Sequence, residues 1–283
     1  MAYEPMTVAG VEVVPLRDAV GPMGGDLRQP PREKFTGGSP EHRAALAGDE
    51  WTLHFRCYLL RGRTGRLVLV DAGLGGRDSP AASWAPVPGR LVDELAAVGV
   101  SPADVGTVVL THLHSDHASG AVTDGVATFP NARHVVQRAE VDWIEGAGPN
   151  PILERVLRPL TGLVDAVEGD AEVAPGVRVL LAPGHTPGHQ VVEIGPLTLT
   201  GDVILHPVQL ADPAIEYAHD DDPARAAETR RQVLRRSRSR GGLIGTAHFP
   251  EPFTRLVPAE PGGDPGAVGG AESGSGAAAR GGP

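Results

Sequence analysis

The sequence predicts an α/β (α+β) fold built as a single domain. Runs rich in β-branched and aliphatic residues alternate with segments that carry apolar residues at helical spacing. The chain has 283 residues, of which 41% are hydrophobic, and this is enough to bury a large core. Several β-rich runs are followed within a few residues by a His or an Asp, so if these strands lie side by side we expect their ends to share one edge of the fold. The predicted strands are residues 11–16, 53–60, 66–70, 107–110, 134–137, 177–181, 190–194, 197–200 and 243–244.

Local signals define how these elements begin and end. The connector RGRTG at 61–65 is polar and contains glycine, which predicts a hairpin between the strands on either side. Apolar residues at helical spacing predict a helix over 90–98 that stops at Gly99, and Ser101 followed by proline predicts the start of a short helical turn. The other predicted helices are residues 139–145, 152–157 and 223–238.

Two stretches are predicted to be irregular. Residues 18–50 are rich in Gly and Pro, and a loop of this length inside a domain is typical of a lid, so a substrate-covering loop is our hypothesis for it. Residues 258–283 contain one bulky apolar residue, Val268, and predict a disordered tail. The domain is therefore assigned to residues 1–257.

Charge and cysteine content exclude several classes of protein. The formal net charge of −10 argues against a general nucleic-acid binder, which needs a positive surface. The one cysteine, Cys57, lies in an apolar run, so we expect a buried residue and neither a disulfide nor a Cys-based zinc site. The first residues do not read as a secretory signal, and no run approaches the ~20 apolar residues of a membrane span. The prediction is a soluble cytoplasmic protein with no membrane partner.

A cluster of metal-ligating residue types follows the strand at 107–110. His112, His114, Asp116 and His117 fall within six residues, and imidazole and carboxylate groups are ligands that Zn²⁺ prefers. The spacing of His112 and His114 places both rings on one side of an extended segment. Four groups in one loop, together with the other strand ends, predict a metal centre.

Three further residues complete the predicted centre, because each follows a predicted strand: His185, Asp202 and His248. Seven ligands with one bridging carboxylate suit two ions, and the open position of such a centre holds a water or hydroxide. Zn²⁺ is the expected ion, and Mn²⁺, Fe²⁺ and Co²⁺ suit the same ligands. The alternative, that these are ordinary packed or surface residues, does not explain why so many histidines follow strands.

The motifs HLHSDH (preceded by VVLT), APGHTPGH, TGD and GTAH resemble those of the metallo-β-lactamase superfamily over residues 11–255. The resemblance implies a four-layer αββα sandwich with a two-metal centre on its edge. Carried over by position, His112, His114 and His185 would hold one ion, Asp116, His117 and His248 the other, and Asp202 would bridge them. Asp71 matches an Asp that supports the metal loop, and its alternative role is a turn-forming Asp.

The Asp116-His117 pair resembles the lactonase, glyoxalase II and ribonuclease branches, and GDVILHPVQ at 201–209 resembles the lactonase and organophosphate-hydrolase-like subgroup. Lactonases of this kind place a tyrosine three residues after the bridging Asp, where this chain has Leu205. Tyr217 is our candidate to replace it from the next loop. His206 would line the substrate pocket or pack within a loop.

The resemblance implies hydrolysis of a small-molecule lactone or ester by a hydroxide that bridges the metals. Asp116 would pass a proton to the leaving group, or act as a ligand only. His189 is expected to support the centre structurally. A glyoxalase II-like thioesterase is the alternative, followed by a phosphoesterase or ribonuclease, and the protein would be a monomer or a homodimer.

Overall fold

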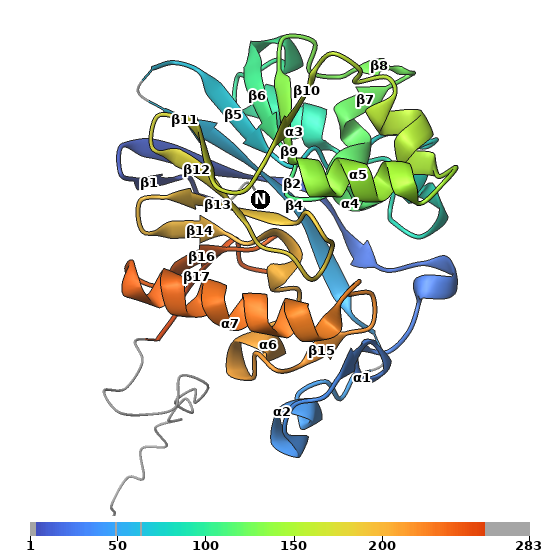
Figure 1. Cartoon of the computed structure of the whole chain (residues 1–283), viewed down its shortest axis with the longest axis vertical. Coiled ribbons are helices and arrows are strands. Elements are labelled where there is room, and N and C mark those ends of the chain that lie inside the picture. The colour runs from blue at the N-terminus through green and yellow to red at the C-terminus, as the bar shows by residue number, and fades with distance from the viewer. Residues whose placement is uncertain (1–3, 49, 63, 258–283) are drawn as a thin grey trace, which may run out of the picture.

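A mixed seven-stranded sheet forms the first half of the protein (Figure 1). The structure is a computed structural model that describes residues 4–48, 50–62 and 64–257. Antiparallel pairing joins the first four strands in the sheet order, and parallel pairing joins the last four. In sheet order the strands are β1 (Met6–Val8), β2 (Val11–Pro22), β4 (Thr52–Arg61), β5 (Leu67–Val70), β6 (Val105–Val109), β9 (Arg133–Gln137) and β10 (Val164–Val167).

A second, six-stranded sheet comes from the C-terminal half and is also mixed, since only β14 and β16 pair in parallel among its described strands. In sheet order its strands are β11 (Ala171–Ala174), β12 (Val177–Leu181), β13 (Gln190–Ile194), β14 (Leu197–Leu199), β16 (Leu243–Gly245) and β17 (Phe253–Arg255).

The two sheets pack face to face, and helices cover their outer faces. One buried cluster joins valines of the first sheet, such as Val109, to residues of the second, such as Val192 and Ile194. Helices α3 (Leu91–Ala97) and α5 (Arg138–Gly146) lie over the first sheet, and α7 (Pro223–Ser239) lies over the second (Figure 1). Full burial of each aliphatic side chain contributes about 1.5–3 kcal/mol. The four-layer arrangement confirms the predicted fold class.

The predicted strands and helices are present, with shifts of at most two residues at their ends except in the first strand, which was predicted to end at Leu16 and continues to Pro22. Residues 153–157 form a π-helix, and Ser101 and Asp104 form a capping box at the start of a 3-10 turn. The prediction missed β1, β10, β11 and β17, because these edge strands are short and β10 is only half buried. Cys57 is buried as expected, and burial raises the pKa of its thiol. The predicted tail, 258–283, lies outside the described residues.

Residues 18–50 are more ordered than the sequence predicted. Strand β2 continues to Pro22, and the segment then forms α1 (Pro31–Lys34), β3 (Phe35–Thr36) and α2 (Pro40–Ala44). Strand β3 pairs with β15 (Glu216–Tyr217), which follows α6 (Val208–Ala211). The apolar residues in this stretch have no helical or strand spacing in the sequence. They pack as a group against the 205–217 segment and do not form one face of a single helix or strand. Minor elements are α4 (Ser115–Ala118), β7 (Val122–Thr123), β8 (Val126–Ala127) and five described 3-10 turns at 25–27, 80–83, 102–104, 119–121 and 201–203.

Asp18 holds the loop after β5 against the start of α3. Its side chain is fully buried, and its two oxygens accept hydrogen bonds from the backbone N–H groups of Leu74 (2.7 Å) and Leu91 (2.8 Å). A Cβ at Gly73 or Gly89 would lie within 2.4 Å of the carboxylate, so glycine is required at both positions. Because the loop held by Asp18 starts with Asp71, this contact also positions the centre described below.

We predict that Asp18→Ala lowers the free energy of unfolding by about 2–5 kcal/mol, because it leaves two buried N–H donors without acceptors. Urea unfolding measures the change. The control is Asp93→Ala, on the exposed side of α3, which should change stability by less than about 0.5 kcal/mol. Equal stability of the two variants would contradict the structural role of Asp18.

Candidate metal centre

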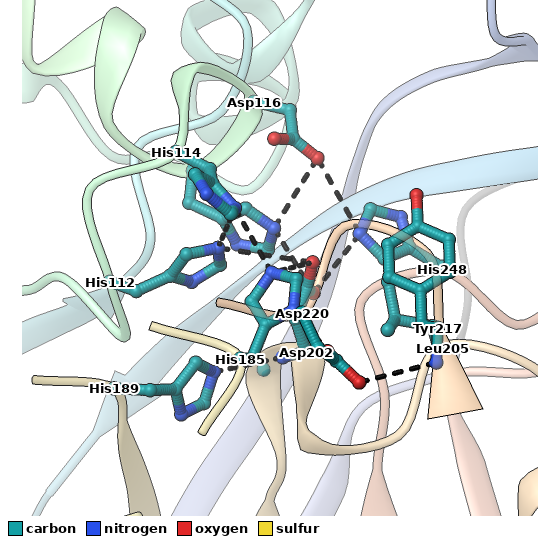
Figure 2. A network of polar contacts seen from close by, with 12 residues as sticks. His112, His114, Asp116, His185, His189, Asp202, Leu205, Tyr217, Asp220 and His248 are labelled. Carbon is teal, nitrogen blue, oxygen red and sulfur yellow. Dashed lines mark hydrogen bonds and ion pairs between the residues drawn. The ribbon is translucent and has the colours of Figure 1, made fainter. Parts of the chain in front are cut away.

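Four strand ends bring seven buried or nearly buried His and Asp side chains to one edge of the sandwich, as the sequence predicted (Figure 2). The loop after β6 and the short helix α4 supply four of them, and the ends of β12, β14 and β16 supply one each. The seven residues are His112, His114, Asp116, His117, His185, Asp202 and His248.

The first group consists of three imidazoles and one oxygen of Asp202. The Nδ1 atom of His114 lies 3.0 Å from the Nε2 atoms of both His112 and His185. The Oδ2 atom of Asp202 lies 3.4 Å from His185 Nε2 and 3.8 Å from His112 Nε2. Ligand atoms around a tetrahedral zinc ion, with bonds of ~2.0–2.1 Å, lie roughly 3.3 Å apart. The spacing therefore fits a single small cation.

The second group shares Asp202 with the first. Its Oδ1 atom lies 3.2 Å from His117 Nε2 and 3.1 Å from His248 Nε2. The Oδ2 atom of Asp116 lies 3.3 Å and 3.5 Å from the same two nitrogens. Because the two oxygens of Asp202 face different groups, its carboxylate is placed to bridge two ions.

Three buried atoms at the meeting point are close to one another but make no hydrogen bond of acceptable geometry: His117 Nε2, His248 Nε2 and Asp202 Oδ1. Buried polar atoms are rarely left in this state unless an ion or water satisfies them. Imidazole and carboxylate are the donor types that borderline divalent cations bind. The residues present therefore fit a pair of divalent metal ions.

Burial and neighbouring charges keep the imidazoles in different states. Burial, together with neighbouring histidines, holds the pKa of His112 well below its usual range and lowers that of His114 to about 3, so both rings are neutral. Burial would also lower the pKa of His117, but the carboxylates of Asp202, Asp116 and Asp71 raise it well above the usual value. Burial opposes ionisation of Asp202, but the facing His117 and His248 hold its pKa well below the usual range. The carboxylates of the second group therefore stabilise positive charge between them, which suits a cation.

Asp71, which the resemblance predicts to support the metal loop, contacts two residues of that loop. Its Oδ2 atom lies 2.8 Å from His117 Nδ1, and Oδ1 accepts a hydrogen bond of 2.8 Å from the N–H of Thr111. Asp71 adopts a φ of 61°, a left-handed turn conformation that Asp tolerates. On the opposite side, His248 Nδ1 donates to the carbonyl of His54 on β4 at 2.8 Å.

Asp220 and Glu140 also support the centre, and the sequence analysis did not identify their roles. The Nδ1 atom of His185 lies 2.8 Å from Asp220 Oδ1, and buried Arg230 lies 3.6 Å from the other oxygen. Glu140 accepts N–H bonds from Leu113 and Gly188, both 2.9 Å, and so joins the two histidine-bearing loops. Both acids stand in ordinary polar contexts in the sequence, so no local pattern distinguishes them.

His189 and His206 occupy different surroundings. His189 Nε2 accepts the backbone N–H of Asp202 at 3.0 Å, and its ring packs 4.9 Å from that of His112. A Cβ at Gly201 would lie 2.7 Å from this nitrogen, so glycine is needed there. His206 packs against the rings of Phe35 and Trp51, and among the described residues it does not line the cavity that opens onto the candidate metal centre.

A cavity of about 200 Å³ opens onto the centre. Its walls are largely apolar, and the indole N–H of Trp84 donates to Ser115 Oγ at 3.1 Å. Tyr217 lines the cavity, and its ring stacks on that of His185 with 6.1 Å between the two ring centroids. Apart from the metal-centre residues, the cavity is lined by Met23, Leu27, Leu53, Trp84, Ser115, Leu205, Tyr217 and His219.

Comparison with known proteins agrees with this geometry. A family model described as the metallo-beta-lactamase superfamily matches residues 56–248. An N-acyl homoserine lactonase of a Bacillus species is 40% identical over 118 residues, which cover 40% of this chain and 44% of that protein. N-acyl homoserine lactonase AttM of Azorhizobium caulinodans is 33% identical over 183 residues, which cover 56% of this chain and 64% of AttM. The chain thus matches less than two thirds of the length of each relative.

A solved structure similar to this one is that of AidC, a dizinc quorum-quenching lactonase in complex with the product N-hexanoyl-L-homoserine. The TM-score is 0.74, and the match covers 89% of this chain and 92% of AidC. The identity is 22%, so the likeness shows a shared fold.

A search of the described residues for a membrane-spanning helix finds no candidate of sufficient length and hydrophobicity.

We predict that Asp220→Asn lowers zinc affinity about 10–100-fold, because the amide no longer holds the His185 ring as a carboxylate does. A competition titration with a chromophoric chelator measures the affinity. Asp221→Asn removes the same charge from the neighbouring exposed position and should leave the affinity unchanged. If both variants bind zinc like the parent, Asp220 does not orient His185.

Proposed function

Because the chain belongs to the metallo-beta-lactamase superfamily, we propose that it is a hydrolase that uses two divalent metal ions to open a lactone or an ester. The observation that carries the proposal is the convergence of seven ligand side chains, with Asp202 facing both groups. The lactonase names of the relatives support the lactone or ester as substrate class.

In this proposal His112, His114 and His185 hold one ion, and Asp116, His117 and His248 hold the other. Asp202 lies between them. Zn²⁺ is the expected ion, with Mn²⁺, Fe²⁺ and Co²⁺ compatible with the same donors. When bound, such ions polarise a carbonyl oxygen and lower the pKa of a water to near neutrality.

Asp116 is the proposed proton carrier. It lines the cavity, and although burial opposes ionisation, His117 and His248 lower the pKa of its carboxyl group. An ionised Asp116 can accept a proton from the attacking water and pass it to the oxygen that leaves the acyl carbon. The same carboxylate also serves as a ligand, so its two roles are compatible.

Tyr217 is the proposed donor to the substrate carbonyl. Leu205, which stands three residues after Asp202, lines the cavity with an apolar side chain and cannot donate. The hydroxyl of Tyr217 contacts Met23 Sδ at 3.9 Å, and thioether sulfur is only a weak acceptor. This hydroxyl is therefore free to turn toward a substrate oxygen, and stacking on His185 keeps it beside the centre.

We predict that the purified, metal-analysed protein contains two metal equivalents and hydrolyses lactones or alkyl esters. Chelation or Asp202→Asn should lower kcat/KM at least about hundredfold, because the carboxylate between the two groups is lost. A parallel screen of thioesters and phosphotriesters tests the alternatives. Turnover that survives both treatments would rule out the proposed mechanism, and exclusive thioester turnover would favour the glyoxalase II-like alternative.

We further predict that Tyr217→Phe lowers kcat/KM about hundredfold, a loss typical for one donor to a developing oxyanion. Phenylalanine keeps the ring that stacks on His185, so thermal unfolding should be nearly unchanged and serves as the control. Steady-state kinetics on the best ester or lactone measure the effect. Unchanged kcat/KM would show that the hydroxyl takes no part.

A further inference from the structure

Lys34 is the single lysine in the sequence, and every other one of the 25 basic Lys and Arg residues is an arginine. Most of these arginines have exposed or half-exposed side chains, whereas Lys34 is only 1% exposed. Lysine rarely lies fully buried unless its charge has a partner. The burial of this one lysine therefore requires an explanation.

Backbone pairing holds Lys34 beside the cavity. Lys34 ends helix α1, and its carbonyl accepts the N–H of Ala218 at 2.7 Å. The next residue, Phe35, pairs with Tyr217 in the β3–β15 ladder, and Figure 1 shows α1 close to β15. These contacts fix Lys34 against the 216–219 segment, which contributes Tyr217 and His219 to the cavity wall.

The ammonium group lies behind His219, which lines the cavity, whereas Lys34 itself is not part of the cavity wall among the described residues. Lys34 Nζ lies 3.5 Å from His219 Nε2. The His219 ring packs 5.2 Å from Tyr217, whose ring stacks on the metal-centre residue His185. A continuous series of contacts therefore leads from Lys34 along the cavity wall to the metal centre.

The nearby carboxylates are engaged elsewhere. Asp220 faces His185 and Arg230, and Asp212 accepts the N–H of Ser39 and contacts His42. Over the described residues, no carboxylate lies within ion-pair distance of Lys34 Nζ. An ammonium has three N–H donors, so the contact with His219 leaves donors unused.

His219 offers a hydrogen-bond donor to an incoming anion. Burial lowers the pKa of Lys34, and burial together with the charge of Lys34 lowers the pKa of His219. A neutral His219 that accepts from Lys34 at Nε2 carries its proton on Nδ1, which makes that nitrogen a donor. A carboxylate that accepts from His219 would lie close to the buried ammonium of Lys34 and would offset its desolvation.

We propose that Lys34 and His219 form a recognition site for an anionic substituent in the cavity wall, so that the preferred substrate is a lactone or ester that carries a carboxylate. This proposal rests on the hydrolase function proposed above, because it names the class of substrate for that same centre. In the alternative, Lys34 contributes only packing.

Matched substrates test the proposal. Monoethyl esters of glutarate, adipate, pimelate and suberate are compared with ethyl esters of the monocarboxylic acids of equal length. At the best length, the metal-loaded parent protein should prefer the carboxylated ester about tenfold in kcat/KM, mainly through KM, as expected for one charge-assisted hydrogen bond. The preference should disappear in Lys34→Met and persist in Arg43→Met, which removes an exposed charge from the same segment. Equal ratios in the parent and Lys34→Met would overturn the proposal.

A second readout needs neither turnover nor a variant. Metal-loaded protein labelled with ¹³C-lysine has one lysine side-chain signal, because the sequence contains one lysine. The dicarboxylate of the preferred length should shift the Cε signal of Lys34, and the matching monocarboxylate should leave it in place. A signal that ignores every dicarboxylate overturns the anion site, even if esters are hydrolysed. A shifted signal in a protein that hydrolyses neither esters nor lactones supports the anion site and rejects the hydrolase function instead.

Discussion

The carboxylate of Asp202 is the group on which the rest of the centre depends. It is almost fully buried, and its two oxygens face two different sets of imidazoles. An ionised carboxylate in the interior is unfavourable unless charges and hydrogen bonds compensate for the lost water. The chain meets this requirement with positive or polarisable groups on both sides, and the backbone N–H of Asp202 is fixed by His189. The position of this one side chain therefore determines how far apart the two groups can lie.

The orientation of the imidazoles comes from contacts on their far sides. His117 is held by Asp71 after β5, His185 by Asp220 after β15, and His248 by the carbonyl of His54 on β4. Each anchor belongs to a different part of the fold from the ring that it holds. Such outer contacts set the tautomer and direction of a ligand, so the two sheets and the loops between them act together to build the centre.

The cavity is assembled from segments that are distant in the chain. Its apolar wall uses Met23 and Leu27 from the N-terminal segment together with Leu205 and Tyr217 from the C-terminal half. The short β3–β15 ladder holds these two segments together. Because the metal-centre residues lie on other elements, changes in the wall can alter the choice of substrate without moving the groups that act on it.

The sequence by itself determined the sandwich fold and the identity of the seven converging residues. Each lies in the loop or turn that follows a strand with a clear β-rich pattern. The sequence shows these strand ends, and the ends of neighbouring strands meet at one edge of a sandwich. Only the tertiary structure decided the roles of Asp18, Asp220, Glu140 and the pair of Lys34 and His219. These residues contact partners that lie at least 27 positions away in the chain, and Lys34 contacts a residue 185 positions away. Local periodicity in the sequence cannot indicate contacts over such separations. Three-dimensional packing alone brings them together, because burial of a polar group depends on what the whole fold places around it.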